Sequence, residues 1–396
     1  MRYSTVIIGG GMAAARLLTQ LKALSYEGSV VVISEESHFG YNRVLLPQFL
    51  GGDCTLNDLM TVSRESESMH IVSDCIAEVV DPLKRIIHTN RGEFEYQNVV
   101  FATGSAVPEP ACLQGIKTTN KMALRTLADA EQLRSLFINS RGERGTAVIL
   151  GGGLLGLEVG SALLQLGLRV CVVHRSDRVL NRQLDHRGAL ALEQELQAQG
   201  FEIFLKRELA GFDLDDQNNI KQVRLDDGTT IEADVLLLAT GTEPRTALAR
   251  NSGASCQRGI VVDARLETSL KGHFAIGECA EYKSEVCGLV APTHLQADVL
   301  AQNLCGYIAQ YKPPEHSTQL KVSGIELFSA GDLSGGDQEV CIRSSDNKIY
   351  RRLNFSQQTL MGAVFFGDIT GASAIKQHLG QAVSEPSVRE QLAFGL

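Results

Sequence analysis

The residues of this chain whose types and spacing most directly indicate chemistry are the small residues Gly9, Gly11 and Ala14. They follow the apolar run of residues 6–8 and precede an alanine-rich segment, which gives the pattern G-x-G-x-x-A between a strand and a helix. In such a unit Gly9 allows the tight turn, Gly11 lets the backbone approach a pyrophosphate, and Ala14 lets the helix pack close to the strand. The pattern therefore predicts a dinucleotide-binding site at the N-terminus of this helix.

The pattern occurs a second time, at Gly151, Gly153 and Gly156, after the apolar run of residues 147–150. One glycine-rich turn is weak evidence, but two in the same strand–turn–helix context predict two nucleotides held face to face. Glu158 lies on the helix expected after the second turn, near where a nicotinamide would meet a flavin. A carboxylate there is either part of a nicotinamide pocket or an ordinary acid on a helix face.

The residues that follow the next strand differ between the two units. The strand expected over residues 30–33 is followed by Glu35, whose carboxylate can accept a hydrogen bond from an adenosine ribose hydroxyl. The strand expected over residues 169–173 is followed by His174 and Arg175 instead. Arg175 either binds the 2′-phosphate of NADPH or lies on the adenine or in solvent. These residues alone leave both NADH and NADPH open.

A loop and two strand ends also suit a bound flavin. The loop of residues 39–48 carries an aromatic residue, Arg43 and a proline, which would serve the pyrophosphate and the ring edge; the alternative is a packed loop with a surface arginine. Two expected strands end in the same tripeptide, A-T-G, the first with Thr103 and Gly104 and the second with Gly241. Small residues there let the chain pass close to a dinucleotide and cross to the next domain.

A further expected strand ends in Gly277-Glu278-Cys279-Ala280, a pattern that places an acid over the ribityl chain of a flavin. The hydroxyls of that chain can donate to the Glu278 carboxylate. Pro292 lies just before the helix predicted over residues 293–309, which would lie beneath the flavin ring.

Composition sets the class of protein. A hydrophobic share of 44% and 38 glycines in 396 residues indicate a compact α/β protein of two or three domains. The formal net charge of −9 argues against a nucleic-acid partner. The first strand starts almost at Met1, and no apolar stretch reaches the roughly 20 residues of a membrane helix. We therefore expect a cytoplasmic protein with no signal peptide and no membrane partner.

The nine cysteines do not have the spacing of a metal or redox site. The chain contains no C-x-x-C, and the closest pair is Cys279 and Cys287. The spacing and the odd count predict free thiols in a reducing compartment, with no metal site and no disulfide framework.

Taken together, the two glycine turns, the paired A-T-G ends and the G-E-C-A segment resemble the two-dinucleotide flavoprotein reductases over about residues 1–310. A closer resemblance is to the reductase part of NADH-dependent nitrite reductase large subunits and to the electron-transfer subunits of assimilatory nitrate reductases, with rubredoxin reductases next. The stretches that carry it are residues 41–46, 172–174, 182–185, 275–281, 288–292, 320–325 and 328–332.

The resemblance implies an α/β fold with two Rossmann-like domains and a small α+β C-terminal domain. The FAD-binding domain would be discontinuous, with residues 1–110 and 242–312; residues 111–241 would bind NAD(P)H, and residues 313–396 would form a C-terminal interface domain. The flavin-binding positions implied by the resemblance are Gly9, Gly11, Ala14, Glu35, Arg43, Thr103, Gly104, Gly277 and Glu278. The nicotinamide-side positions are Gly151, Gly153, Gly156, Glu158 and Gly241. Because His174 belongs to the stretches that carry the resemblance, the resemblance implies NADH as the substrate. Arg175 leaves NADPH open.

The function that the resemblance implies is an FAD-dependent NAD(P)H oxidoreductase that passes electrons to a redox partner protein. The expected acceptor is an iron–sulfur, haem or rubredoxin-type protein, in assimilatory nitrate or nitrite reduction, and a homodimer is left open. No catalytic acid or base is expected, because hydride transfer between stacked rings needs alignment and water exclusion. The cysteine-rich iron–sulfur and sirohaem domains of the nitrite reductases are missing, so this chain is not expected to reduce nitrite alone.

Three alternatives remain at this point. The first is an NAD(P)H:rubredoxin or ferredoxin reductase; the ferredoxin branch often has a lysine where this chain has Gln48. The second is a cysteine-dependent disulfide or peroxide reductase, which residues 36–50 disfavour because they contain no cysteine and Cys54 lies beyond them. The third is a nucleotide sensor without enzymatic activity.

A basic group near the C-terminus suggests where a partner docks. It consists of Arg343, Lys348, Arg351 and Arg352, on an expected hairpin. These residues either form a docking patch for an acidic electron carrier or lie on an ordinary solvated hairpin face.

Overall fold

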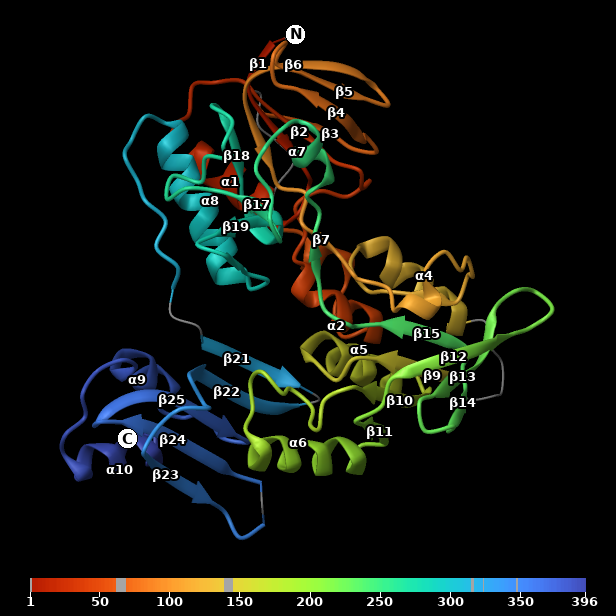
Figure 1. Ribbon diagram of the computed structural model, residues 1–396, viewed down its shortest axis with the longest axis vertical. Coiled ribbons are helices and arrows are strands. Elements are labelled where there is room, and N and C mark those ends of the chain that lie inside the picture. Colours follow the sequence, from red (N-terminus) through yellow and green to blue (C-terminus); the bar gives the residue numbers. More distant parts are fainter. Residues whose placement is uncertain (1, 62–68, 139–144, 315–316, 323, 347) are drawn as a thin grey trace. The chain divides into compact units, whose positions relative to one another are not determined.

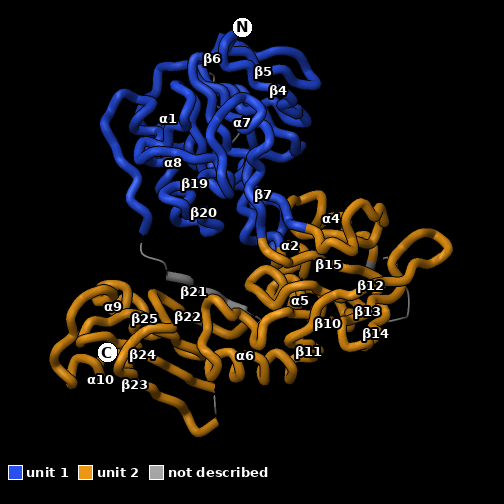
Figure 2. Tube along the Cα trace, viewed as in Figure 1, with its two compact units in different colours: residues 1–46, 54–108, 242–314 blue, residues 47–53, 109–241, 315–396 orange. Residues whose placement is uncertain are grey.

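The computed structural model of the chain describes residues 2–61, 69–138, 145–314, 317–322, 324–346 and 348–396 (Figure 1). These residues form two compact units (Figure 2). Unit 1 comprises residues 1–46, 54–108 and 242–314, and unit 2 comprises residues 47–53, 109–241 and 315–396. Unit 2 includes the C-terminal residues, so the bounds 313–396 predicted for the C-terminal domain stay a prediction.

Unit 1 is built on a seven-stranded sheet with the order β3-β2-β1-β6-β5-β4 and with β18 beside β6. The strands β3, β2, β1, β6 and β18 run parallel, and β5 and β4 continue the sheet as antiparallel strands. The strand β2 and the last three residues of β1 and of β6 are apolar runs because both of their faces are buried. The bounds are β1 Arg2–Ile8, β2 Val30–Ile33, β3 Met69–Val72, β4 Ala77–Asp81, β5 Ile86–Thr89, β6 Gly92–Phe101 and β18 His273–Ala275.

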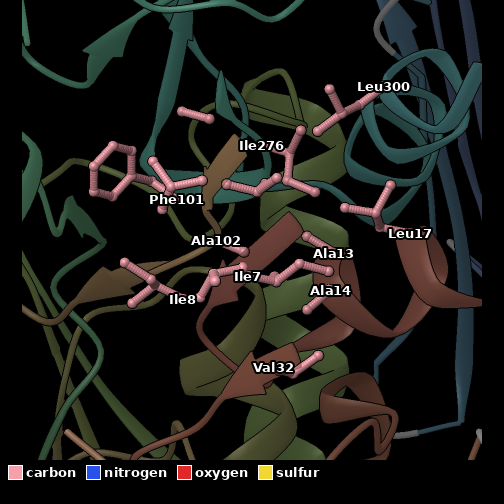
Figure 3. Close-up of a cluster of buried hydrophobic side chains, with 14 of the residues drawn as sticks. Ile7, Ile8, Ala13, Ala14, Leu17, Val32, Phe101, Ala102, Ile276 and Leu300 are labelled. Carbon is pink, nitrogen blue, oxygen red and sulfur yellow. The ribbon is translucent and has the colours of Figure 1, made fainter. Parts of the chain in front are cut away.

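Two long helices pack beside each other on this sheet, α1 (Met12–Ala23) and α8 (Val290–Leu304). Figure 3 shows the core that they share with the sheet, in which Leu17 of α1 and Leu300 of α8 belong to the same buried cluster as the strand residue Ile7. Ala14 is fully buried, and its small side chain lets α1 lie close to β1.

The helix predicted over residues 293–309 is α8, which begins and ends earlier. It begins at Val290 because Pro292 is tolerated in a first helical turn, where a missing N–H loses no helical hydrogen bond. It ends at Leu304, and Gly306 follows with a φ of +87°, a conformation that ends helices.

Short elements complete unit 1 and surround the ends of its strands. They are η1 Arg43–Leu45, α3 Leu56–Leu59, β7 Ser105–Ala106, β16 Glu243–Pro244, α7 Ala247–Asn251, β17 Ile260–Val261, η3 Gly277–Cys279, β19 Ala280–Tyr282 and β20 Glu285–Val286. The helix α2 (Leu46–Gly51) begins at the end of unit 1 and belongs mostly to unit 2.

Unit 2 is built on a five-stranded parallel sheet with the order β11-β10-β9-β15-β8. Its strands are β8 Lys121–Met122, β9 Thr146–Leu150, β10 Arg169–His174, β11 Phe201–Leu205 and β15 Val235–Leu238. The helices are α4 Leu127–Ile138, α5 Leu154–Gln165 and α6 His186–Ala198, with η2 at Ala111–Leu113. A three-stranded antiparallel sheet is formed by β12 Leu209–Leu214, β13 Ile220–Leu225 and β14 Thr230–Glu232.

The C-terminal part of unit 2 is an antiparallel sheet with the order β21-β22-β25-β24-β23. Its elements are β21 Ser317–Val322, β22 Ile325–Gly331, β23 Gln338–Arg343, β24 Tyr350–Ser356, β25 Thr359–Phe366, α9 Ala372–His378 and α10 Pro386–Phe394. The hydroxyl of Tyr350 donates to the Asp185 carboxylate at 2.6 Å, and the Arg352 guanidinium donates to the same carboxylate at 3.2 Å. Asp185 also caps α6, so these contacts fix one face of the sheet to that helix.

Candidate functional site

The first glycine turn has the geometry that requires glycine. Gly9 has a φ of +113°, and a Cβ added there would lie 2.1 Å from the Ala102 carbonyl oxygen at the end of β6. Gly11 is the N-cap residue of α1, and among the described residues no side chain caps the first-turn N–H groups. The guanidinium of Arg43 lies above this helix end, 3.6 Å from a Cβ added at Gly11. A positive helix end and a guanidinium at one point fit the pyrophosphate of a dinucleotide.

Arg43 is held in this place by Glu36 and Tyr41, which the sequence did not identify. The Arg43 guanidinium forms an ion pair with Glu36 and lies 5.2 Å from the centre of the Tyr41 ring. The Tyr41 hydroxyl donates to the other oxygen of the Glu36 carboxylate. Burial is the largest single influence and lowers the pKa of Arg43, but the combined interactions with Glu36, Tyr41 and Glu278 outweigh it and leave that pKa raised. Glu36 thus holds a charged guanidinium over the end of α1.

Arg245 connects three residues predicted on the flavin side. The Arg245 guanidinium forms an ion pair with the exposed Glu35, and the Arg245 backbone N–H donates to the Gly104 carbonyl oxygen at 2.9 Å. The Thr103 hydroxyl donates to the Arg245 carbonyl oxygen at 2.7 Å. The loop after the second A-T-G therefore lies beside the residue predicted for the adenosine ribose. Proximity of Arg245 to Glu35 has no signal in the sequence, because the two residues are 210 positions apart.

Gly277 lies against the start of α1, and Glu278 follows it in the chain. A Cβ added at Gly277, whose φ is +79°, would lie 3.1 Å from the Ala13 Cβ. The Gly277 N–H donates to the Gln296 side chain on α8 at 2.7 Å, and the Ser105 hydroxyl donates to the Glu278 carboxylate. Pro292 lies one turn before Gln296 on α8. The structure thus brings together within unit 1 the glycine turn, Arg43, the first A-T-G end, Glu278 and the start of α8.

Unit 2 repeats the first turn. Gly151 has a φ of +124°, and a Cβ added there would lie 2.2 Å from the Ala239 carbonyl oxygen at the end of β15. A Cβ at Gly156 would lie 2.0 Å from the Gly151 carbonyl oxygen. Gly153 is the N-cap residue of α5, again with no capping side chain among the described residues. No described atom lies within 4 Å of a Cβ added at Gly153, so this helix end is open to a phosphate.

His174 packs on the second turn. Its Nδ1 accepts a hydrogen bond from the Gly152 N–H at 3.1 Å, and burial lowers its pKa. The imidazole is therefore neutral near pH 7 and stabilises the glycine turn through this hydrogen bond. The next residue, Arg175, is exposed.

Glu158 lies on α5, on the helical turn that follows Gly153. Its side chain is half-buried, and burial raises its pKa to about 7. Within the part of the chain that the structure describes, its carboxylate has no hydrogen-bond or ion-pair partner. The helix α2 packs on α5 one turn further along, where a Cβ added at Gly51 would meet Ala162 at 3.5 Å. The pKa of the Glu158 carboxyl group thus lies near neutral pH, which would suit a residue of a nicotinamide pocket.

The basic group on the C-terminal hairpin is not a surface patch. The Arg351 side chain is 4% exposed and forms an ion pair with Asp368 at 2.7 Å. Arg352 pairs with Asp185 and with Glu339. Adjacent residues of β24 face opposite sides of the sheet, and both sides are covered. Of the predicted docking group, Arg343 and Lys348 remain exposed.

The described residues show no group of three or more potential metal ligands, and no described helix is long and apolar enough to cross a bilayer. Cys279 follows Glu278 and is fully buried against the carbonyl oxygens of Phe101 and Ile276, each 3.3 Å from its sulfur. Burial raises the pKa of this thiol, which disfavours the reactive thiolate.

Comparison with known proteins gives the family. Residues 3–297 match the model of the pyridine nucleotide-disulphide oxidoreductase family, and residues 317–382 match the rubredoxin NAD+ reductase C-terminal domain. The chain is 33% identical over 371 residues to a nitrite reductase [NAD(P)H] of Bacillus subtilis (strain 168), covering 92% of this chain and 45% of that protein. It is 30% identical to the assimilatory nitrate reductase electron transfer subunit of the same organism, covering 92% and 47%. The chain thus spans about half the length of these relatives.

A solved structure shows the same fold. The covalent putidaredoxin reductase–putidaredoxin complex matches with a TM-score of 0.87 and 22% identity, over 98% of both chains. The predicted resemblance, the α/β fold with two dinucleotide-binding domains, and the FAD- and NAD(P)H-dependent oxidoreductase class are confirmed at the level of the family. The chain belongs to the pyridine nucleotide-disulphide oxidoreductase family.

Proposed function

We propose that this chain passes electrons from NAD(P)H through FAD to a partner protein, as the reductase component of assimilatory nitrate or nitrite reduction. The observation that carries the proposal is the repeated helix end without a capping side chain, at Gly11 in unit 1 and at Gly153 in unit 2. Each lies where a parallel sheet meets a glycine turn, which is the site at which such folds bind dinucleotides. The similarity to nitrite and nitrate reductase chains supports the pathway.

Residues of unit 1 would hold FAD. The end of α1 and the Arg43 guanidinium would bind its pyrophosphate, and Glu35 would accept from the adenosine ribose. Glu278 would accept from the ribityl hydroxyls, with Ser105 keeping its carboxylate in place. When bound, FAD accepts the hydride of NAD(P)H and gives the two electrons one at a time to the acceptor.

Residues of unit 2 would hold the nicotinamide nucleotide. The end of α5 at Gly153 would bind its pyrophosphate, and Glu158 would contribute to the nicotinamide pocket. Hydride transfer between stacked rings needs no acid or base, so these residues bind, orient and exclude water. A carboxyl group with a pKa of about 7 can donate a hydrogen bond when protonated, and ionisation removes that donor.

The proposed acceptor is an iron–sulfur, haem or rubredoxin-type protein in the cytoplasm. A second candidate function is NAD(P)H:rubredoxin reductase, which the match of residues 317–382 to the rubredoxin NAD+ reductase C-terminal domain favours. A cysteine-dependent reductase is disfavoured because the buried thiol nearest the flavin-side acid, Cys279, is held protonated.

The test begins with the purified chain loaded with FAD and mixed anaerobically with NADH or NADPH. We expect the flavin absorbance to bleach at a rate at least as high as the steady-state turnover rate. A rubredoxin, a ferredoxin and a sirohaem nitrite reductase module are then compared as acceptors, with ferricyanide as the acceptor that needs no docking. Fast reduction of the sirohaem module supports the nitrite pathway, whereas fast reduction of rubredoxin alone supports the second candidate. A chain that binds no flavin, or a bound flavin that NAD(P)H does not bleach, contradicts both.

A further inference from the structure

The two dinucleotide units of this chain carry opposite charge at one equivalent place. In unit 1 the second strand, β2, is followed by the carboxylates of Glu35 and Glu36. In unit 2 the equivalent strand, β10, which follows the glycine turn and α5, ends at His174 and is followed by Arg175. The adenosine ribose of a dinucleotide lies at this strand end, where a carboxylate accepts from a 2′-hydroxyl and an arginine accommodates a 2′-phosphate.

A second cation reaches the same edge from the neighbouring strand. The strands β10 and β11 run parallel with His174 opposite Leu205, so both end at one edge of the sheet. The Lys206 N–H donates to the Ser176 carbonyl oxygen at 3.0 Å, which holds Lys206 next to the residues that follow β10. Arg175 and Lys206 are both exposed. In the part of the chain that the structure describes, neither side chain has an ion pair.

Two arginines near this edge are already engaged. The Arg178 guanidinium pairs with Asp177 at 2.9 Å, and Arg207 pairs with Asp227 at 2.5 Å. His174 uses its Nδ1 to accept from the Gly152 N–H and adds no positive charge near pH 7. Arg175 and Lys206 therefore keep their charge available to a ligand at this edge.

We propose that Arg175 and Lys206 bind the 2′-phosphate of NADPH, so that this chain prefers NADPH to NADH. The inference rests on the proposed function and names the substrate of its nicotinamide site; it departs from the NADH that the family resemblance implies. A guanidinium presents two parallel donors to a phosphate, and an ammonium adds a second positive charge at short range. NADH would leave both cations without a counter-charge and would find no carboxylate directly after β10 for its ribose hydroxyl.

The first test measures nucleotide binding without any electron transfer. The FAD-loaded chain is titrated calorimetrically with 2′,5′-ADP and with 5′-AMP, which differ only in the 2′-phosphate. We expect 2′,5′-ADP to bind at least about tenfold more tightly, and the preference to disappear in the double variant Arg175→Gln, Lys206→Gln. The matched control is Lys221→Gln, an exposed lysine on β13, which should keep the preference. Equal binding of both nucleotides by the unmodified chain overturns the proposal.

The second test compares kcat/KM for NADPH and NADH with ferricyanide as acceptor. The double variant should lose about tenfold or more for NADPH and stay within about twofold for NADH. Equal losses for both nucleotides show a general effect on the site and also overturn the proposal. If neither nucleotide bleaches the flavin, the proposed function fails, and the calorimetry with 2′,5′-ADP still decides the inference.

Discussion

Replacing Glu158 by glutamine should stabilise the protein, and the gain should grow with pH. The folded-state pKa of Glu158 is raised to about 7 from an ordinary value of 4.5 because burial disfavours its ionised form. Between these two values the folded chain keeps a proton that the unfolded chain releases. The contribution of this carboxyl group to the unfolding free energy therefore decreases as pH rises through that window, and it is lowest above the folded-state pKa.

The magnitude follows from the two pKa values. One pKa unit corresponds to about 1.36 kcal/mol. The rise from 4.5 to about 7 therefore corresponds to about 3 kcal/mol of destabilisation at alkaline pH. The side chain is only half-buried, which makes this figure an upper value. Glutamine fills nearly the same volume and does not ionise, so Glu158→Gln removes this cost.

The assay is thermal unfolding of the FAD-loaded chain without nicotinamide nucleotide, at about pH 5 and about pH 8, together with hydrogen exchange of the α5 amides. Hydrogen exchange is included because a protein of two units need not unfold in one step. We expect similar stability of the variant and the unmodified chain at about pH 5, and a variant more stable by several degrees at about pH 8. The control is Glu131→Gln, an exposed acid on α4. A stability difference that does not change with pH, or that shrinks toward alkaline pH, would refute the reasoning.

Three further predictions concern the turns, the anion site and a buried histidine. Gly151→Ala should reduce the yield of folded protein, because the added Cβ would lie 2.2 Å from a carbonyl oxygen. Gly153→Ala should fold normally but raise the KM for NAD(P)H several-fold. Thermal unfolding and steady-state kinetics would check these outcomes. Arg43→Gln should weaken FAD binding by about 2 kcal/mol, or roughly 30-fold, in a flavin-release titration, and Glu36→Gln should weaken it less, since Glu36 only orients the guanidinium. Burial lowers the pKa of His273, so the contribution of this side chain to the unfolding free energy is complete above about pH 6.5 and is lost as pH falls below that value. His273→Gln should therefore make the unfolding free energy fall less steeply on the acid side of a stability–pH profile. An unchanged slope on the acid side would contradict this.

The parts of the site that sequence predicts are those set by local backbone geometry. A turn at Gly9 or Gly151 must have positive φ and must let a carbonyl oxygen approach, and only glycine meets both needs, so the pattern itself carries the information. The same holds for Gly277, which turns at positive φ directly before Glu278. Such positions can be identified from the residues in one short segment.

The parts that sequence did not predict depend on contacts between distant segments. Arg245 reaches Glu35 across 210 positions, and no spacing rule connects them. Arg351 and Arg352 looked like an exposed basic pair because charged hairpins are commonly solvated. The strand places them on opposite faces, and the chain covers one face with α6 and the other with α10, where Arg351 donates to the Ala393 carbonyl oxygen. A strand pattern does not reveal which helices will cover it.

The two proposed anion sites of the chain differ in the way that one resident and one exchanging nucleotide would require. At Gly11 a guanidinium lies beside the positive end of α1, an arrangement that is repulsive unless an anion is present. The ion pair of Arg43 with Glu36 compensates part of this repulsion, and a bound pyrophosphate would compensate the rest, so we expect this site to keep its nucleotide. At Gly153 only the helix end remains, with no described atom within 4 Å of an added Cβ. A nucleotide bound there would gain less from its pyrophosphate and could leave after each hydride transfer, so we expect the tight site in the flavin unit and the exchangeable site in the nicotinamide unit.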